Sequence, residues 1–558
     1  MTSPRLVLAL LSMMSAPAHA AFLHLCSAAA APHGQAAAAA SGPEGELRFV
    51  VNATSSLPGC RSLDLGAAQV ETLHVLGRSA TPTTTILLQG GDRDGRFAVS
   101  EQTLVPDGGA KAPAAPEPMP LRTNLLAAMK VRTYGVEERV HAQLEDGRLA
   151  IICRAGARPA GVLLTGPWTM PRLRATLRAS YSGKGQFAWQ VADAARAARE
   201  SALDMGQTTA TGSATSTQLP LPPQLDRTKW QHFVIACPAA GGTLALSSLA
   251  LEPEPPVAAP RSTWIWDRNA WLERADALLA WAAREGIGEL FIVVTLDDGR
   301  VEDPQALGAF IRRAGTQGIA VSAVEGDPHM VLPTQRAVTA ARARAYAAYN
   351  AQAEPAARLA GVQFDIEPYL LPEHVLPAAA LEREYVATLA ALREAAGGLP
   401  LDFVLPFWWD DRAGILAGLA RHADAVTVMD YRTDPGQIVR FAIPFLDWGA
   451  AKGKRVRIAL EAGSLPIETQ RRYRRAEPGA AGDMLLFTVE DQQVLVLLRQ
   501  PLAHPDARPY RLTGSRPIDG SATTFHRDKA ALRALLPRLE KDFGAWPGFA
   551  GIALHELR

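Results

Sequence analysis

The chain has 558 residues, with 57 Lys and Arg against 56 Asp and Glu and a formal net charge of +1. At about 150 residues per domain, this length is enough for roughly two to four domains that each bury a normal core. The near-zero charge argues against nucleic-acid binding, which needs a basic face, and no apolar run after the N-terminus reaches the ~20 residues of a membrane span.

The N-terminus has the pattern of an export signal. Arg5 supplies a positive start, residues 6–14 are apolar, and Ala18-His19-Ala20 matches the small-x-small cleavage pattern. We therefore expect a signal peptide over residues 1–20, cut after Ala20, and a periplasmic or extracellular protein. A buried N-terminal helix is the alternative.

An Ala-rich linker is expected over residues 21–45, followed by a β-rich region over residues 46–252. Short strand-like runs alternate there with turn-rich loops, which predicts an all-β sandwich of the jelly-roll kind. The last run, residues 242–251, alternates in the manner of a closing sandwich strand and resembles the end of jelly-roll carbohydrate-binding modules. Glycan binding and a plain structural role both stay open for this region.

The four cysteines, Cys26, Cys60, Cys153 and Cys237, all lie in the first half of the chain. Their spacing matches no metal-binding motif, so no metal ion is expected. One disulfide stays open, and a small buried hydrophobe is the main expectation for each thiol. Cys26 is not expected to carry a lipid, because Leu25 stands before it where a small residue is required.

After a Pro-rich joint at residues 253–261, apolar strand-like runs alternate with amphipathic helical runs. Eight such strands are expected, at residues 263–267, 289–294, 318–324, 361–367, 401–407, 425–431, 455–461 and 551–556. Over residues 262–558 this order predicts a (β/α)8 TIM barrel, which typically takes about 250 residues. An open doubly wound sheet is the alternative. The excess length is expected as a hairpin at residues 482–499.

Carboxylates mark the ends of two of these strands, at the face where such barrels carry their chemistry. Because side chains alternate along a strand, Gln363, Asp365 and Glu367 should share the inward face of the fourth strand. Two like charges this close should raise one pKa, as a general acid requires. Glu461, at the end of the seventh strand, should reach the same mouth, with an ion pair to Arg432 as its structural alternative.

Aromatic and polar side chains complete the predicted mouth. The substrate-binding candidates, besides Gln363, are Trp266, Asp267, Trp408, Trp409, Met429, Arg432 and His555, and Tyr431 joins the catalytic set. Ordinary barrel packing is the alternative for the tryptophans. The sequence has no His-Glu-x-x-His, Gly-rich phosphate loop or Gly-x-Ser-x-Gly motif, so no cofactor is expected. Carboxylates with tyrosine and tryptophan are typical of glycoside hydrolysis.

The barrel strands resemble those of glycoside hydrolase family 18, the chitinase-like barrels. That family carries Asp-Gly-x-Asp-x-Asp-x-Glu on the fourth strand and Met-x-Tyr-Asp on the sixth. The matching positions are Asp365, Glu367, Met429 and Tyr431, and the departures are Ala360, Gln363 and Arg432. The resemblance implies an outlying, chitinase-like member. It makes Glu367 the acid/base, with Asp365 and Tyr431 steering an N-acetyl group that acts as internal nucleophile.

A second scheme uses the same strand ends. In the large retaining clan of barrels the acid/base ends the fourth strand and the nucleophile ends the seventh, the places of Glu367 and Glu461; their carboxyl groups would then lie about 5–5.5 Å apart. We expect a secreted glycoside hydrolase with Glu367 as general acid/base. A non-catalytic glycan-binding or scaffold protein is the alternative. The expected partner is a carbohydrate substrate, with no nucleic acid, membrane span or obligate protein partner indicated.

Overall fold

The computed structural model describes residues 22–27, 37–42, 45–52, 60–64, 70–77, 83–93, 96–106, 117–135, 137–193, 202–222, 225, 230–256, 258–371, 375–489 and 492–558. The predicted signal peptide over residues 1–20 lies outside them. The chain forms two compact units. The first comprises Met1–Ala112, Glu367–Tyr385 and Ser464–Ala522, and the second comprises Pro113–Ile366, Val386–Gly463 and Thr523–Arg558.

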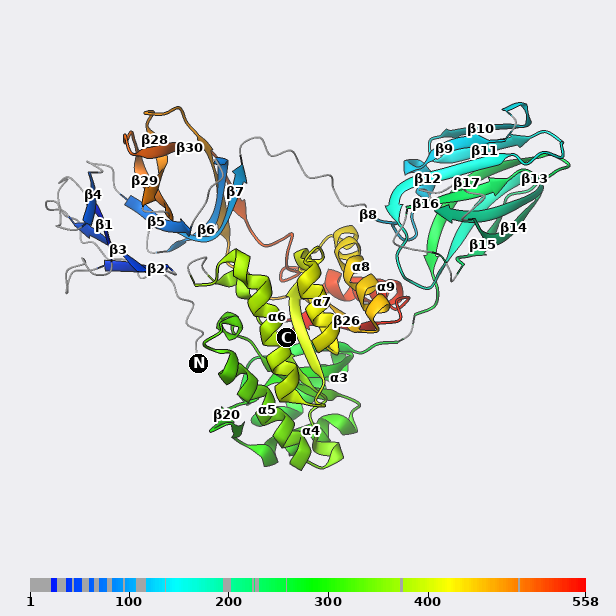
Figure 1. Ribbon diagram of the computed structural model, residues 1–558. Helices are drawn as coiled ribbons and strands as arrows, with labels where there is room; N and C mark the ends of the chain where they lie inside the picture. Colours follow the sequence, from blue (N-terminus) through cyan, green and yellow to red (C-terminus); the bar gives the residue numbers. More distant parts are fainter. Residues whose placement is uncertain are drawn as a thin grey trace. The chain divides into compact units, whose positions relative to one another are not determined.

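A closed barrel of eight parallel strands lies in the second unit (Figure 1). Its strands follow one another in chain order: β18 (Arg261–Ile265), β19 (Ile287–Val293), β22 (Ala320–Glu325), β23 (Val362–Phe364), β24 (Leu401–Pro406), β25 (Ala425–Met429), β26 (Arg455–Glu461) and β31 (Phe549–His555). Most residues of these strands are buried, since one face fills the barrel and the other packs outward.

Eight α-helices are described, all from residue 268 onward: α2 (Arg268–Leu272), α3 (Ala275–Glu285), α4 (Pro304–Thr316), α5 (Arg336–Gln352), α6 (Ala378–Ala396), α7 (Ala413–His422), α8 (Pro435–Lys452) and α9 (Lys529–Phe543). Capping residues explain their limits. Asp434 accepts a hydrogen bond from the Gln437 amide at the start of α8, and Gly453 ends that helix in the left-handed conformation. A short hairpin, β20 (Leu296–Asp297) with β21 (Arg300–Val301), precedes α4.

Charged side chains are buried inside the barrel. Arg457 on β26 has a 2% exposed side chain and forms ion pairs with Glu289 on β19 and Asp402 on β24. Burial raises the pKa of Asp402, and the Arg457 charge only partly offsets this effect. Ser322 on β22 adds a hydrogen bond of 3.2 Å to Glu289. The barrel interior is therefore held together by buried ion pairs as well as by apolar packing.

A ten-stranded sheet, also in the second unit, is built around the long strand β13 (Ala175–Asp193). The other strands are β8 (Glu117–Pro118), β9 (Lys130–Tyr134), β10 (Val140–Glu145), β11 (Arg148–Cys153), β12 (Gly161–Thr169), β14 (Leu203–Thr211), β15 (Thr215–Pro220), β16 (Trp230–Ala236) and β17 (Gly242–Pro253). The N-terminal half of β13 pairs with β15 and β17, and its C-terminal half pairs with β14 and β16.

Glycines allow this sheet to bend where the pairing changes. Gly183 in β13 has φ +135°, and a Cβ there would lie 2.0 Å from the Thr243 carbonyl oxygen. Gly212, between β14 and β15, has φ +106°, and its amide donates to the Gly183 carbonyl at 2.7 Å. Only glycine readily adopts these conformations. The chain therefore bends at Gly183 and at the neighbouring Gly212, which folds one sheet into the two layers of a sandwich.

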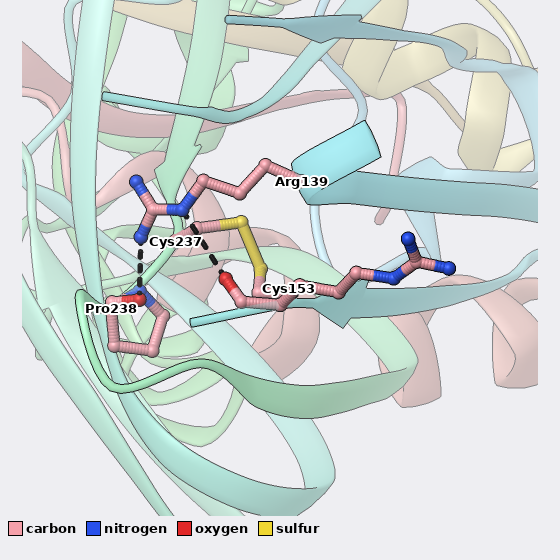
Figure 2. The surroundings of a disulfide bond; sticks show 5 residues. Arg139, Cys153, Cys237 and Pro238 are labelled. Atoms are coloured by element: carbon pink, nitrogen blue, oxygen red, sulfur yellow. Dashed lines mark hydrogen bonds between the residues drawn. A yellow bond between two sulfur atoms is a disulfide. The ribbon is translucent and has the colours of Figure 1, made fainter. Parts of the chain in front are cut away.

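A disulfide joins Cys153, at the end of β11, to Cys237, which follows β16, across 84 residues of sequence (Figure 2). Beside it the buried Arg139 donates to the Arg154 carbonyl at 3.2 Å and to the Pro238 carbonyl at 2.9 Å. One guanidinium thus binds the residue after each cysteine. The expectation that these two cysteines are reduced buried hydrophobes is wrong.

The first unit contains two sheets. One has four strands, β1 (Phe22–Ser27), β2 (Ala37–Gly42), β3 (Gly45–Asn52) and β4 (Cys60–Asp64). The other has seven, in the order β5 (Val70–Gly77), β29 (Gln492–Leu502), β28 (Gly482–Val489), β30 (Ala507–Ile518), β27 (Glu468–Arg475), β6 (Thr83–Arg93) and β7 (Arg96–Pro106). The predicted hairpin at residues 482–499 is confirmed as β28–β29. The apolar core of the seven-stranded sheet comprises Ile86, Leu88, Phe97, Tyr473, Met484, Leu486, Leu495, Leu497 and Tyr510.

The expected fold class, a (β/α)8 TIM barrel preceded by a single all-β sandwich, is wrong for this chain. The described residues form 31 strands against eight α-helices, so the protein is mostly β. Strands β27–β30, which lie between barrel strands β26 and β31 in sequence, complete a sheet with β5–β7 from the N-terminal region. Residues 46–252 therefore contribute to three sheets. Strand pairing over several hundred residues is not visible in local periodicity, which is why the prediction failed.

No α-helix in the described part of the chain combines the length and apolar character needed to cross a bilayer.

Candidate functional site

Six side chains gather where parallel barrel strands end, and we call them the mouth cluster: Trp266, Asp365, Tyr431, Glu461, His555 and Glu556. Trp266 follows β18, Asp365 follows β23, Tyr431 follows β25, Glu461 ends β26, and His555 ends β31 with Glu556 after it. Strands in a closed parallel barrel end at the same rim, so residues far apart in sequence meet there. All six belong to the second unit.

Glu461 and His555 form the centre of the cluster. They are direct neighbours across β26 and β31, and the His555 Nδ1 lies 2.7 Å from a Glu461 carboxylate oxygen. The other Glu461 oxygen accepts the Gly463 amide at 2.5 Å. With a side chain only 6% exposed, Glu461 is a buried carboxylate that has two donors. The alternative expectation of an Arg432 ion pair is replaced by this contact with His555.

Both nitrogens of the His555 ring are engaged. The Trp266 indole N–H donates to Nε2 at 3.2 Å, so Nδ1 carries the proton that Glu461 accepts when the ring is neutral. Burial lowers the pKa of His555, but the hydrogen bond with Glu461 and the charges of Glu461, Glu556 and Asp365 together raise it above its ordinary value. The ring therefore takes up a proton more readily than a free histidine.

Close approach at two glycines shows how tightly the cluster is assembled. A Cβ on Gly463 would lie 2.3 Å from a Glu556 carboxylate oxygen and 2.9 Å from one of Glu461. A Cβ on Gly326, which follows β22, would lie 3.3 Å from the Trp266 ring and 3.5 Å from the Asp365 Cβ. Since the two glycines bring three carboxylates and an indole together, even a methyl side chain at Gly463 would disturb the cluster.

The remaining aromatic side of the cluster is Tyr431, whose ring stacks on His555 with centroids 6.2 Å apart and planes 22° from parallel. Arg432 packs against an aromatic ring. Its guanidinium lies over Phe407, 4.6 Å from the ring centre, and donates to the Tyr431 carbonyl at 2.8 Å. Arg432 therefore supports the backbone at Tyr431.

Three of the predicted substrate-binding residues are buried: Gln363, Met429 and Trp409, with exposures of 0%, 7% and 2%. Gln363 donates to the Thr427 hydroxyl at 3.0 Å and accepts from the Trp264 indole inside the barrel. The other two tryptophan positions are open, with Trp266 40% and Trp408 50% exposed. The ligand role of each residue stays a prediction.

Asp267 and Glu367 have local partners. Asp267 accepts the Asn269 amide at 2.9 Å at the start of α2 and forms an ion pair with Arg274. Glu367 is the residue before the 3-10 turn η5 (Pro368–Leu370), is half-buried, and accepts a hydrogen bond from the Tyr369 hydroxyl. Strand β23 stops at Phe364, three residues before Glu367, and Glu367 opens the segment grouped with the first unit.

Sequence reasoning missed Glu556, an exposed carboxylate in the left-handed conformation with φ +47°. Such a backbone is uncommon outside glycine and tends to occur at functional sites. Lys529 donates to the carbonyls of Glu556 and Leu557 at 3.0 and 3.1 Å, which holds this turn. The signal available in the sequence was an acidic residue at the end of the predicted last strand, residues 551–556.

A second missed group is Asp430. It follows β25 directly and is 0% exposed, and burial raises its pKa well above the ordinary range despite the Arg432 charge. Among the residues that the structure describes, no group of His, Cys, Asp and Glu side chains is arranged to hold a metal ion.

Comparisons with known proteins find no matching family model and no matching curated protein. Among solved structures, a family 29 carbohydrate-binding module is 10% identical at a TM-score of 0.18, covering 32% of this chain and 88% of that one. A CBM29-2 mutant complexed with cellulohexaose is 11% identical at a TM-score of 0.18, over 32% and 90% of the chains. The CBM22-1–GH10 modules of Clostridium thermocellum xylanase 10B, complexed with xylohexaose, are 10% identical at 0.26, over 61% and 80%. Likeness at these TM-scores establishes neither the fold nor the function of this chain.

Proposed function

We propose that this protein binds an uncharged carbohydrate at the mouth cluster. The observation that carries the proposal is Trp266, whose indole is 40% exposed while its N–H is held by His555. A tryptophan fixed in this way presents an apolar ring face to solvent at little further entropic cost. The C–H faces of sugar rings stack on such surfaces.

The charges around Trp266 favour a neutral ligand. Asp365, Glu461 and Glu556 bring three carboxylates close to a single imidazole, as their combined effect on the His555 pKa indicates. Carboxylate oxygens accept hydrogen bonds from sugar hydroxyls, whereas an anionic group would be repelled. The exposed Glu556 is the carboxylate of the cluster most accessible to a ligand.

The test is a binding screen against neutral hexasaccharides of glucose, xylose, mannose and N-acetylglucosamine by isothermal titration. We expect one of them to bind, and Trp266→Ala to weaken that binding at least about tenfold, the scale of a buried aromatic contact. The matched control is Ile152→Ala, which removes another exposed apolar side chain, 51% exposed on β11. Failure of every sugar to bind, or equal affinities of Trp266→Ala and the parent, would contradict the proposal.

Glycoside hydrolysis is the second candidate, and Glu461 is the observation that favours it. Its buried carboxylate accepts from both Gly463 and His555, an environment suited to holding negative charge opposite a developing sugar cation. The sequence-based assignment of Glu367 as general acid/base belongs to this candidate.

Hydrolysis of any oligosaccharide that the parent binds should fall at least about 1000-fold in Glu367→Gln if Glu367 is the acid, with affinity retained. Reducing-end assays on the parent, Glu367→Gln and Glu461→Gln distinguish the two candidates. A parent that binds the sugar and leaves it intact would support binding alone.

A further inference from the structure

Four arginines line one face of the seven-stranded sheet, and we call them the arginine strip: Arg472, Arg474, Arg511 and Arg516. Arg472 and Arg474 lie on β27, and Arg511 and Arg516 lie on the neighbouring β30. All four side chains are exposed. Alternation along β27 places Arg472 and Arg474 opposite in direction to Tyr473, which belongs to the apolar core.

The register puts the four arginines on the same face. Arg474 lies directly opposite Arg511, Arg472 lies opposite Gly514, and Gln470 lies opposite Arg516. Tyr510, which is next to Arg511, points into the core. From Gln470 to Arg474 the strip extends about 13 Å along the strand.

An arginine on the inner side of the same strand behaves differently. Arg471 forms a two-point ion pair with Glu71 at 2.8 and 3.2 Å, and its guanidinium lies 4.0 Å from the centre of the Phe97 ring. No residue of the arginine strip has a carboxylate partner within the described part of the chain. Arg511 donates to the Ala481 carbonyl at 3.1 Å, and Arg516 donates to the Gln470 side chain at 3.0 Å.

Nearby carboxylates are engaged elsewhere. Glu468, at the start of β27, accepts from the Gln89 amide at 2.7 Å, and Asp483 accepts the Leu512 backbone amide at 2.9 Å. Like charges directly opposite one another in a sheet, as at Arg474 and Arg511, destabilise it. In a chain whose net charge is only +1, this concentration of unneutralised charge indicates a surface that receives an anionic ligand.

We propose that the arginine strip is a binding surface for an acidic polysaccharide, separate from the neutral-sugar site proposed at the mouth cluster. Arginine forms two parallel hydrogen bonds to one carboxylate or sulfate group, and acid groups repeating along a polymer can meet successive arginines of the strip. Stacking of bases needs aromatic side chains, and the four positions contain none, which favours a polysaccharide over single-stranded nucleic acid.

The experiment measures binding of polygalacturonate to the full chain at several salt concentrations by affinity electrophoresis and titration. We expect binding that weakens steeply with salt, because neutralising a polyanion releases its counterions. Arg472→Gln/Arg474→Gln should reduce affinity at least about fivefold at low salt and lower the salt slope by about two. Arg472→Lys/Arg474→Lys keeps the charge and should retain most of the binding.

The matched control, Arg154→Gln/Arg158→Gln, removes two exposed arginines from the sandwich and should leave polygalacturonate binding unchanged. Xylan serves as the neutral polymer, and a single-stranded oligonucleotide and phosphatidylglycerol vesicles serve as other polyanions. Absence of polygalacturonate binding, or equal binding by Arg472→Gln/Arg474→Gln, overturns the proposal. Tighter arginine-dependent binding of the oligonucleotide or vesicles also overturns it. Trp266→Ala should leave this binding intact, which separates the result from that at the mouth cluster.

Discussion

His555 links the aromatic and acidic sides of the mouth cluster, since one ring nitrogen meets Glu461 and the other meets Trp266. The two contacts respond oppositely to protonation. An imidazolium donates from both nitrogens, so it strengthens the bond to Glu461 and can no longer accept the Trp266 N–H. Protonation of His555 therefore removes the hydrogen bond that holds the exposed indole of Trp266.

The stability of the barrel near His555 should depend on pH. The pKa of His555 is raised in the folded protein, so the contact with Glu461 stabilises the fold fully below the unfolded pKa of about 6.5. This stabilisation is lost as the pH rises through the folded pKa. We expect His555→Gln to cost about 1–3 kcal/mol at pH 5.5 and less at pH 9, measured by hydrogen exchange of the β31 amides.

Glu461→Gln provides the control for this prediction, because it removes the charge while keeping a hydrogen-bond acceptor. The pKa of His555, followed by NMR of its ring, should fall in that variant. An unchanged pKa would mean that Glu461 is not the main partner.

At the scale of the elements, the parallel strands are joined through Arg457, which contacts β19 and β24 from β26. Removing one member of a buried ionic group leaves the others uncompensated. We predict that Arg457→Met destabilises the barrel by about 3–5 kcal/mol, measured by urea unfolding with hydrogen exchange of the β24 and β25 amides. Arg455→Gln, at an exposed position of the same strand, should change stability by less than about 0.5 kcal/mol. Equal losses of stability in Arg457→Met and Arg455→Gln would show that the buried ion pairs do not stabilise the barrel.

The disulfide stabilises the sandwich by joining the end of β11 to the residue that follows β16. Loss of the bond in Cys153→Ala/Cys237→Ala should lower the stability of the sandwich by about 2–4 kcal/mol. Thermal unfolding with and without reductant measures this, and hydrogen exchange locates it. Faster exchange should be confined to strands β9–β17. A loss spread equally over the barrel strands would contradict the prediction.

At the scale of the whole molecule, the insertion between β26 and β31 leaves and re-enters the barrel at one place. Thr524 donates to the Gly463 carbonyl at 2.6 Å, and the Phe525 amide donates to the Glu461 carbonyl at 2.9 Å. The inserted strands meanwhile supply Tyr473, Met484 and the other residues that bury Ile86 and Leu88. The seven-stranded sheet thus depends on two segments, β5–β7 and β27–β30, that lie far apart in the chain.

We predict that replacing residues 464–522 with a short Gly-Ser linker leaves the barrel folded and unfolds the seven-stranded sheet. Amides of β6 should then exchange at least about 100-fold faster, because β6 loses its partner β27, whereas those of β25 should be little affected. Protection of β6 in the shortened chain would show that β5–β7 form a stable sheet without the insertion.

Much of the mouth cluster is predictable from local pattern. Alternation along β26 and β31 places Glu461 and His555 at one rim because every parallel strand of a barrel ends there. Asp365 and Glu367 differ, since β23 ends at Phe364 and the chain then turns into η5. Alternation has no meaning once a strand has ended, and the residue before a proline is restricted in its own way.

Local sequence is sufficient to locate the apolar strand runs, the sign of charge at each position and the inward or outward direction of a side chain, since these depend on neighbours a few residues away. The folded chain alone establishes which strands pair and which cysteines bond. It also shows that Glu461 meets His555 and that Arg472 and Arg511 share an unneutralised face. These contacts join segments far apart in sequence, and burial of shared apolar cores, which no local pattern encodes, selects them.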